Sequence, residues 1–336
     1  GMARAQAFLS RLAVRAWYKT ANSEGASLMK IIVTGSSGLM GAALVKTLLA
    51  RGDEVTCLVR TAAHARRADG AREVLWNPAR GELDGAELEG HDAAVHLAGD
   101  PIAEGRWSNE KKRRIRDSRV QGTTLLAATL AQLRTPPRAL LSASAVGYYG
   151  DRGGEILTEA SATGADFLSG VCREWEGSTG SARAVGMRVV LLRFGVVLSG
   201  GGGALAKMLT PFKLGAGGKI GSGEQYMSWI ALDDATGAIL HALAHEELEG
   251  AVNVVAPRAV TNGEFTKTLG GVLGRPTLFA VPAFAARLAF GEMADATLLA
   301  SQRAEPSRLK ATNYEFKYPE LEGALRHALG DAAANG

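Results

Sequence analysis

Short apolar runs alternate with longer amphipathic stretches over most of this chain. The run Ile31–Val33 is too short for a helix and is β-branched throughout, so it predicts a buried parallel strand. Strands that alternate with helices form a parallel sheet covered by helices on both faces. The pattern therefore predicts an α/β fold with a Rossmann-type doubly wound parallel sheet. Further strands are expected at Glu54–Val59, Val74–Trp76, Ala93–Gly99, Arg138–Ser142 and Arg188–Arg193, and helices at Ala42–Ala50, Asn109–Leu133 and Phe167–Val185.

The pattern changes after Leu198, where glycine-rich loops surround a predicted helix at Ala204–Phe212. A strand at Val252–Val255 lies between predicted helices at Asp233–His245 and Asn262–Leu273, and a mostly helical tail follows. We expect an N-terminal extension over residues 1–28 and the Rossmann domain over residues 29–198. A smaller C-terminal α/β substrate lobe with a helical C-terminal domain is expected over residues 199–330, and a return of the chain to the Rossmann sheet within that span stays open. Ligands of open α/β sheets bind at the carboxyl edge, which this lobe is expected to cover.

Three glycines spaced three apart, Gly35, Gly38 and Gly41, stand between the first predicted strand and the first predicted helix. Gly35 allows a tight turn, Gly38 lets the backbone approach a pyrophosphate, and Gly41 lets the helix pack closely on the strand. The N-terminus of the helix adds unpaired N–H groups and the positive end of a dipole. The motif predicts dinucleotide binding, with a purely structural glycine turn as the alternative.

The end of the second predicted strand indicates which dinucleotide is bound. An acidic residue there accepts hydrogen bonds from a free ribose 2′-hydroxyl, whereas an arginine pairs with a 2′-phosphate. This chain carries Arg60 at that point, with Thr61 beside it, Arg66 and Arg67 shortly after, and no acidic residue before Asp69. The sequence therefore favours NADP(H) over NAD(H), held by Arg60 and Thr61. A solvated charge at the strand end is the alternative for Arg60.

Composition and charge exclude several classes of protein. Of the 336 residues, 46% are hydrophobic and 21% are charged, which is typical of a soluble globular protein. No apolar run reaches the ~20 residues that a membrane span needs. The net charge of +4 includes +3 from residues 1–28, where four basic residues face Glu24 alone, so the rest of the chain carries +1. That leaves no basic face for nucleic acid, and we expect neither a nucleic-acid nor a membrane partner.

The two cysteines, Cys57 and Cys172, lie in a predicted strand and a predicted helix without metal-type spacing. We expect reduced thiols and no metal site. The segment Ala3–Lys19 is basic with apolar residues at intervals, which resembles an organelle transit peptide or a surface helix. A poorly ordered leader is the alternative. We expect a cytoplasmic protein, with organelle import through residues 1–28 left open.

Several motifs, taken in order, resemble those of an extended short-chain dehydrogenase/reductase: Thr34–Gly41, His96–Gly99, Ser142–Ser144 and Arg193–Leu198. More narrowly, Ser144–Gly150, Phe167–Glu176 and Met227–Ile230 are similar to an atypical branch described as nucleoside-diphosphate-sugar epimerase family proteins. The tail, Gly291–Asp295 and the residues from Pro306 onward, resembles the C-terminal domain of that branch. The resemblance covers the chain from Met29 to Leu329 and leaves residues 1–28 unexplained.

The resemblance implies a set of contacts with the cofactor. The glycine loop is expected to contact the pyrophosphate, and the exit loop of the fourth strand to flank the adenosine. Arg119 and Arg193 are similar to arginines that relatives use near the cofactor, although a salt bridge on a helix face is the alternative for Arg119. The expected cofactor-binding residues, with Arg60 and Thr61, are Gly35, Ser36, Ser37, Gly38, Leu39, Met40, Gly41, Leu97, Ala98, Gly99, Arg119, Ser142 and Arg193.

The catalytic pattern of the family is incomplete in this chain. Members that oxidise or epimerise sugars carry Tyr-x-x-x-Lys on the helix after the fifth strand, where the tyrosine is the general acid/base and the lysine lowers its pKa. Leu168 and Cys172 stand at those positions here, and neither does that chemistry. Ser144 matches the serine of the family that hydrogen-bonds the substrate, so we expect Ser144 to orient the reacting oxygen and Tyr149, or a water, to relay the proton. Without a nearby lysine the pKa of that tyrosine is expected near ~10, which slows base catalysis at neutral pH.

The substrate pocket is expected to have aromatic and thioether walls, because such groups shape apolar clefts. That Tyr149 and its neighbour only wall this pocket is the alternative to proton relay. The expected wall residues are Trp107, Tyr148, Met227 and Trp229.

Together these features predict an NADP(H)-dependent oxidoreductase or epimerase-like enzyme for a small polar, nucleotide-sugar-like substrate, acting as a monomer or homodimer. A non-catalytic NADP(H)-binding sensor or carrier is the alternative, motivated by the missing Tyr-x-x-x-Lys pair. A third possibility, an RNA-associated protein, is disfavoured by the low charge of the chain after residue 28.

Overall fold

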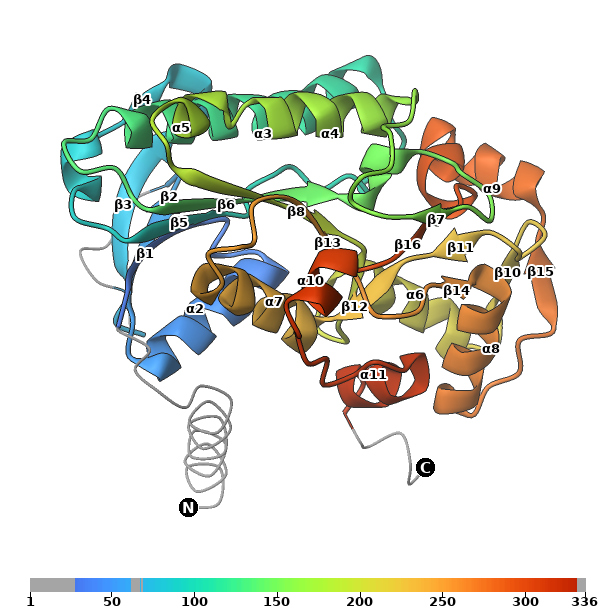
Figure 1. Ribbon diagram of the computed structural model, residues 1–336. Helices are drawn as coiled ribbons and strands as arrows, with labels where there is room; N and C mark the ends of the chain where they lie inside the picture. The colour runs from blue at the N-terminus through green and yellow to red at the C-terminus, as the bar shows by residue number, and fades with distance from the viewer. Residues whose placement is uncertain (1–27, 62–66, 68, 331–336) are drawn as a thin grey trace.

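The computed structural model describes residues 28–61, 67 and 69–330, so the predicted extension 1–28 (except Leu28) and Arg66 lie outside the described residues. An eight-stranded sheet lies between two layers of helices, which confirms the predicted α/β fold of the Rossmann type (Figure 1). Its strands are β1 (Lys30–Thr34), β2 (Glu54–Val59), β3 (Arg72–Asn77), β4 (Glu82–Leu83), β5 (Ala93–His96), β6 (Ala139–Ala145), β8 (Arg188–Phe194) and β13 (Gly250–Val254). Their order is β13-β8-β6-β5-β1-β2-β3-β4, and every neighbouring pair is parallel except β3 and β4.

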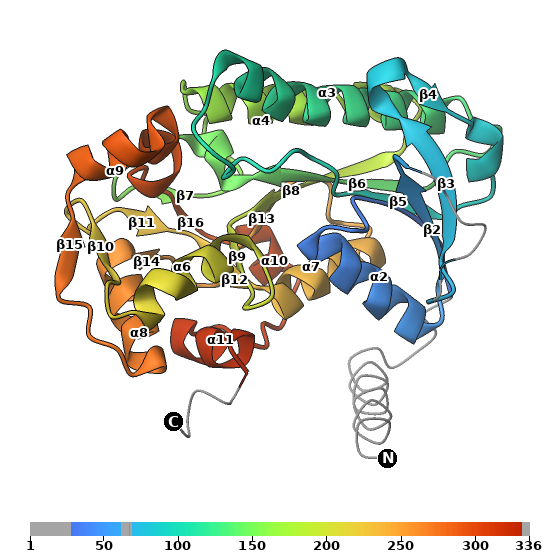
Figure 2. The ribbon, with the colours of Figure 1, turned by 180° about the vertical axis from the view of Figure 1, so that it is seen from behind.

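The helices of the sheet cover its two faces (Figures 1 and 2). One face carries α3 (Asn109–Ala131), α4 (Phe167–Gly177) and α5 (Gly180–Ala184), and the other carries α2 (Leu39–Arg51) and α7 (Leu232–Ala244). The central strands are buried on both sides, which is why they appear in the sequence as continuous apolar runs. Helix α2 buries Leu44, Val45 and Leu48 and ends at Gly52, which adopts the left-handed conformation with φ 100°.

The single helix predicted over Phe167–Val185 is wrong, because the structure has two helices there, α4 and α5. The break lies at Ser178 and Thr179, whose hydroxyls donate to the carbonyl oxygens of Glu174 and Glu176. Such side chains compete with the backbone for helical carbonyls, and glycines on both sides of the break weaken the helix further.

The remaining elements form a smaller lobe beside the carboxyl ends of the sheet strands (Figures 1 and 2). Strand β13, however, pairs in parallel with β8, so the chain returns to the main sheet after leaving it. Buried apolar residues of the lobe form a cluster of their own that includes Leu198, Phe265 and Leu325. The strands outside the main sheet are β7 (Ile156–Leu157), β9 (Val196–Leu198), β10 (Gly218–Ile220), β11 (Tyr226–Met227), β12 (Trp229–Ala231), β14 (Val260–Thr261), β15 (Phe279–Val281) and β16 (Arg303–Ala304). The further helices are α6 (Gly203–Lys213), α8 (Asn262–Leu273), α9 (Ala283–Phe290), α10 (Ser307–Ala311) and α11 (Leu321–Ala328), with a π-helical turn η4 at Ala294–Leu298 and 3₁₀ turns η1 (Pro78–Arg80), η2 (Gly85–Leu88) and η3 (Val146–Tyr149).

Candidate functional site

The glycine loop between β1 and α2 has no room for side chains at two of its positions. A Cβ atom on Gly35, which has φ +68°, would lie 2.8 Å from the carbonyl carbon of Leu97, and one on Gly41 would overlap the carbonyl oxygen of Gly35. Gly38 caps α2 without any side-chain hydrogen bond to the first turn of the helix. The N–H groups at this helix end are therefore free of a side-chain cap, and their dipole favours an anion. The loop fits the pyrophosphate of a dinucleotide.

The other residues of the loop divide into exposed and buried positions. Ser37 is exposed, whereas Ser36 is buried and hydrogen-bonds the thiol of Cys57, whose pKa is raised by burial. Leu39 lies against Gly203 at the start of α6, and Met40 packs on the edge of the main core. The structure thus brings the predicted loop residues together, with the backbone and Ser37 facing outward.

The side-chain hydroxyl of Thr34 links the glycine loop to the loop that follows β5. Thr34 Oγ1 accepts hydrogen bonds from the backbone N–H groups of Leu97 and Ala98 and lies 2.7 Å from His96 Nδ1. Because both acceptor positions of the hydroxyl are used, its hydrogen points to His96 Nδ1, and the imidazole carries its proton on Nε2. Burial lowers the pKa of His96 to about 4, so the ring is neutral. Leu97, Ala98 and Gly99, the predicted adenosine-flanking residues, are held beside the glycine loop in this way.

The predicted 2′-phosphate ligands lie just beyond the end of β2. Arg60 and Thr61 are both exposed, and Arg60 forms no ion pair with any residue that the structure describes. Arg67 instead pairs with Asp69 at 3.0 Å and approaches the thiol of Cys57. Arg60 is therefore the more available of these two cations for an anionic ligand.

Arg119 supports the loop that follows Gly99. Its guanidinium donates to the carbonyl oxygens of Asp100 and Ile115 and stacks over the ring of Trp175, 5.0 Å from the ring centroid. A Cβ atom on Gly99 would lie 3.3 Å from its Cζ. Burial lowers the pKa of Arg119. The alternative, a salt bridge on a helix face, is not among the described contacts of Arg119, whose guanidinium instead hydrogen-bonds the backbone beside the predicted cofactor-binding loop.

A buried charge pair lies at the carboxyl ends of β6 and β8. Glu176, on α4, accepts hydrogen bonds from Arg193 Nε and Nη2 at 2.8 and 2.9 Å, and Ser144 donates to the same carboxylate at 2.7 Å. All three residues are less than a tenth exposed. Burial lowers the pKa of Arg193, but the hydrogen bonds and charge of Glu176 outweigh this and raise it overall. The pair is therefore a carboxylate and a guanidinium, and Ser144 faces the anion.

Tyr149 extends this network away from Ser144. Its hydroxyl accepts a hydrogen bond from Arg193 Nη1 at 3.0 Å and donates to Asn253 Oδ1 at 2.6 Å, and the side chain is fully buried. Burial raises the pKa of Tyr149. Tyr148 is half-buried, and Arg193 Cζ lies 3.5 Å from the centroid of its ring. The predicted proton relay through Tyr149 stays a prediction, and in this structure both hydrogen bonds of its hydroxyl are made inside the protein.

The positions at which the family resemblance implies tyrosine and lysine both lie on the buried face of α4. Cys172 is buried, and burial raises its pKa to about 12, with a hydrogen bond to Ser144 opposing that rise. Leu168 is also buried and lies against Gly147. Leucine has no ionisable group, and the raised pKa keeps the thiol of Cys172 protonated, so neither side chain acts as a general base at neutral pH. Ser142, predicted to bind the cofactor, is fully buried in β6.

The predicted walls of the substrate pocket are not all in one place. Trp107 makes an edge contact with Phe167, and its indole N–H donates to the carbonyl of Ile102. Met227 is half-buried in β11. Trp229 packs inside the cluster of the smaller lobe and donates to the carbonyl of Arg258, so its contact with a substrate stays a prediction.

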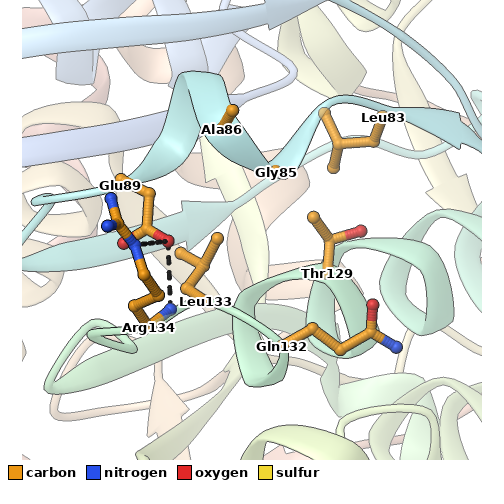
Figure 3. Close-up of a pocket in the computed structure, with 8 residues that line it drawn as sticks. All are labelled: Leu83, Gly85, Ala86, Glu89, Thr129, Gln132, Leu133 and Arg134. Atoms are coloured by element: carbon orange, nitrogen blue, oxygen red, sulfur yellow. Dashed lines mark hydrogen bonds and ion pairs between the residues drawn. The ribbon is translucent and has the colours of Figure 1, made fainter.

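Figure 3 shows a surface pocket of about 410 Å³ that lies apart from these residues, at the C-terminal end of α3. Its one charged pair, Glu89 and Arg134, spans one side, where the backbone N–H of Arg134 lowers the pKa of Glu89. None of the predicted site residues lines it. The lining residues are Leu83, Gly85, Ala86, Glu89, Thr129, Gln132, Leu133 and Arg134.

Sequence reasoning missed Glu176 and Asn253. A glutamate on an amphipathic helix is usually solvated, and its partners Ser144 and Arg193 come from two different strands. One signal was available: Glu176 follows Leu168 and Cys172 at intervals of four residues, which places it on the buried face of α4.

Two further observations bear on the sequence predictions. Within the described ranges, no three His, Cys, Asp or Glu side chains come together as a metal ion would require, and Cys57 and Cys172 are free thiols. Every helix that the structure describes is too short or too polar to cross a bilayer.

Comparison with known proteins agrees with this geometry. A model described as the NAD dependent epimerase/dehydratase family matches residues 31–255, and a domain of unknown function, DUF1731, matches residues 281–328. Epimerase family protein Mb2239 of Mycobacterium bovis is 43% identical over 298 residues, which are 89% of this chain and 97% of that protein.

Solved structures extend the likeness to three dimensions. A crystal structure of human epimerase family protein SDR39U1 (isoform2) with NADPH matches with a TM-score of 0.80 at 35% identity, over 90% of this chain and 99% of the human chain. The nucleoside-diphosphate sugar epimerase from Corynebacterium glutamicum matches with a TM-score of 0.74 at 38% identity, over 91% of this chain and 59% of that chain. The resemblance indicated by the motifs is thereby confirmed: this chain belongs to the NAD dependent epimerase/dehydratase family, within the extended short-chain dehydrogenases/reductases.

Proposed function

We propose that this chain is an NADP(H)-dependent oxidoreductase or epimerase-like enzyme that acts on a small polar, nucleotide-sugar-like substrate. The observation that carries the proposal is the glycine loop, where the backbone at Gly35 and Gly41 is too closely packed for any Cβ atom and the N-terminus of α2 carries no side-chain cap. The human relative crystallised with NADPH and the nucleoside-diphosphate sugar epimerase support the cofactor and the substrate class.

The residues present fit NADP(H). The loop Gly35–Gly41 would hold the pyrophosphate, Leu97–Gly99 would flank the adenosine, and the exposed Arg60 with Thr61 would meet the 2′-phosphate. When bound, the cofactor supplies or accepts a hydride at the substrate carbon.

Ser144 and Glu176 would accept the proton that a substrate hydroxyl releases. Because Ser144 donates to Glu176, its oxygen lone pairs are left to accept a hydrogen bond from a substrate hydroxyl. As that hydroxyl gives its proton to Ser144 Oγ, the serine proton passes to the carboxylate. Arg193 holds the carboxylate of Glu176 in position through two hydrogen bonds. Glu176 is better placed than Tyr149 for this role, since the tyrosine hydroxyl is occupied by Arg193 and Asn253.

A second function, a non-catalytic NADP(H) sensor or carrier, is favoured by one observation. Leu168 and Cys172 replace the family's acid/base pair, and burial raises the pKa of the thiol to about 12. In that case the network around Glu176 would be purely structural.

Purified full-length protein tests both functions. NADPH and NADH affinity is measured by calorimetry, and turnover is followed with NADPH and a panel of carbonyl compounds that includes keto-sugar nucleotides. We expect NADPH binding with turnover that Ser144→Ala abolishes and the control Ser178→Ala retains. NADPH binding without turnover assigns the sensor function, and absence of NADPH binding overturns both.

A further inference from the structure

Seven large apolar side chains are exposed at one end of the molecule. This end face comprises parts of α9, of β15 with the residue before it, and of the segment between α6 and β10, and both ribbon views place these elements at the end opposite β2 and β3 (Figures 1 and 2). Exposed fractions run from 37% for Val281 to 89% for Leu278. The end-face residues are Leu214, Leu278, Phe279, Val281, Phe284, Leu288 and Phe290.

The backbone holds these segments together. Strand β15 pairs in parallel with β10, with Phe279 opposite Gly218, which has no side chain to separate the two backbones. The next helix, α9, begins at Ala283 against Gly221, at the end of β10. Phe284 and Leu288 lie one helical turn apart and so share a face of α9.

The end face is larger than a monomer normally exposes. From the exposed fractions, the seven side chains present roughly 800 Å² of apolar surface, against about 300–600 Å² for the largest patch on a typical monomer. About 800 Å² per partner is also the size of a standard specific protein interface.

We propose that the end face is a homodimer interface, in which β15 and α9 of two copies pack across a two-fold axis. In the described part of the chain, β15 pairs with β10 alone, so its outer edge is open to a further strand. Antiparallel pairing of two β15 strands is compatible with a two-fold axis, because each copy then contributes the same surface to the interface. Three exposed basic residues, Lys213, Lys219 and Arg275, lie near the apolar residues along the chain, and Arg287, between Phe284 and Leu288 on α9, is paired with Asp295 at 2.8 Å.

The open strand edge favours a second copy over a membrane surface. Exposed basic residues near apolar side chains would also attract anionic lipid, but lipid tails cannot hydrogen-bond the backbone groups of β15. A second copy of this chain would bury the apolar residues and would also hydrogen-bond the open edge of β15.

The interface would continue toward the predicted substrate wall. Directly after α9, Glu292 pairs with Lys112 at 2.7 Å, at the start of α3, and Arg106 lies against Gly291. Trp107 is the next residue along the chain. Dimerisation would therefore hold the segment that carries Trp107, whether or not the proposed reaction takes place.

Sedimentation velocity of the full-length protein over a wide concentration range tests the proposal. We expect a dimer for the wild type and for the control Val185→Asp, which changes an exposed valine beside α5. The double variant Phe284→Asp/Leu288→Asp should be a monomer with an unchanged circular dichroism spectrum. A wild-type monomer, or a dimer that the double variant leaves intact, overturns the proposal.

Cysteine cross-linking identifies the face independently. Because Cys57 and Cys172 are buried, a cysteine introduced by Phe279→Cys is the reactive thiol of the described chain, and oxidation should give a covalent dimer. Cross-linking through Val185→Cys instead would overturn the proposal. Flotation with phosphatidylglycerol vesicles tests the membrane alternative. A wild type that is monomeric and floats with the vesicles, when the double variant does not float, would also overturn the proposal and would assign the end face to a membrane.

Discussion

Ser144 donates its hydroxyl hydrogen to Glu176, with 2.7 Å between the two oxygens. Glu176 lies one helical turn beyond Cys172, the position at which the family resemblance implies the lysine of the Tyr-x-x-x-Lys pair. The serine of this chain therefore faces an anion from the next turn of α4. Arg193 donates hydrogen bonds to both oxygens of the same carboxylate.

Glu176→Gln should destabilise the protein strongly. The variant keeps the shape of the side chain but leaves the buried guanidinium of Arg193 without its counter-charge, which costs about 3–5 kcal/mol. The free energy of unfolding in urea measures this loss. Glu174→Gln is the matched control, because its pair with Arg116 is exposed and worth at most about 1 kcal/mol. Similar losses in the two variants would contradict a buried charge pair.

Tyr149→Phe tests whether the hydroxyl of Tyr149 contributes to stability alone or also to catalysis. Removing the hydroxyl leaves Arg193 and Asn253 each without one hydrogen bond, so we expect a loss of about 1–3 kcal/mol in unfolding free energy. Turnover per folded molecule should stay within a few-fold of the wild type. A fall of more than about a hundredfold, roughly 2.7 kcal/mol in the barrier, with NADPH affinity intact would instead establish Tyr149 as the proton relay.

Arg60→Ala should weaken NADPH binding far more than NADH binding. An arginine–phosphate contact at this exposed position is worth about 1–3 kcal/mol, or roughly five- to 150-fold in affinity. Calorimetry with both cofactors measures the difference. Arg80→Ala removes another exposed arginine outside the predicted site and should leave both affinities unchanged. Equal weakening of NADPH and NADH by Arg60→Ala would refute the 2′-phosphate assignment.

Gly41→Ala should abolish cofactor binding, because the added methyl group overlaps the carbonyl oxygen of Gly35 and forces the loop apart. Gly170→Ala is the control, since nothing lies within 4 Å of the added Cβ and this glycine is inside α4. Alanine there should stabilise the protein by about 0.5–1 kcal/mol. NADPH titration and thermal melting read out the two effects. Normal NADPH affinity in Gly41→Ala would show that the loop does not hold the pyrophosphate.

His96 should make stability depend on pH between about 4 and 6.5. Its pKa is lowered to about 4 by burial, so in this window the unfolded chain binds more protons on His96 than the native protein does. The contribution of about 3 kcal/mol is complete above pH 6.5 and is lost as the pH falls toward 4. His241, whose pKa burial also lowers to about 4, adds a similar dependence. Unfolding free energies at pH 5 and 7.5 should therefore differ less in His96→Asn than in the wild type, and an unchanged difference would contradict this account.

Some of these features could be predicted from the sequence and others could not. The strands of the main sheet are visible because buried parallel strands must be apolar throughout, and the glycine loop because only glycine fits Gly35 and Gly41. The division of α4 from α5 depends on where two hydroxyls find carbonyl partners. The burial of Glu176 depends on Arg193, which arrives from β8 only when the sheet has formed. Local pattern carries no information about such long-range partners.

The parallel pairing of β13 with β8 bears on how the protein is made. A nascent chain of 198 residues contains β8 but not residues 250–254, so one edge of the cofactor-binding sheet has no neighbour at that stage. Open apolar edges of this kind invite pairing with other chains. Completion of the sheet is thus a late event of biosynthesis, and a polypeptide terminated between α6 and β13 would carry the glycine loop on an aggregation-prone sheet.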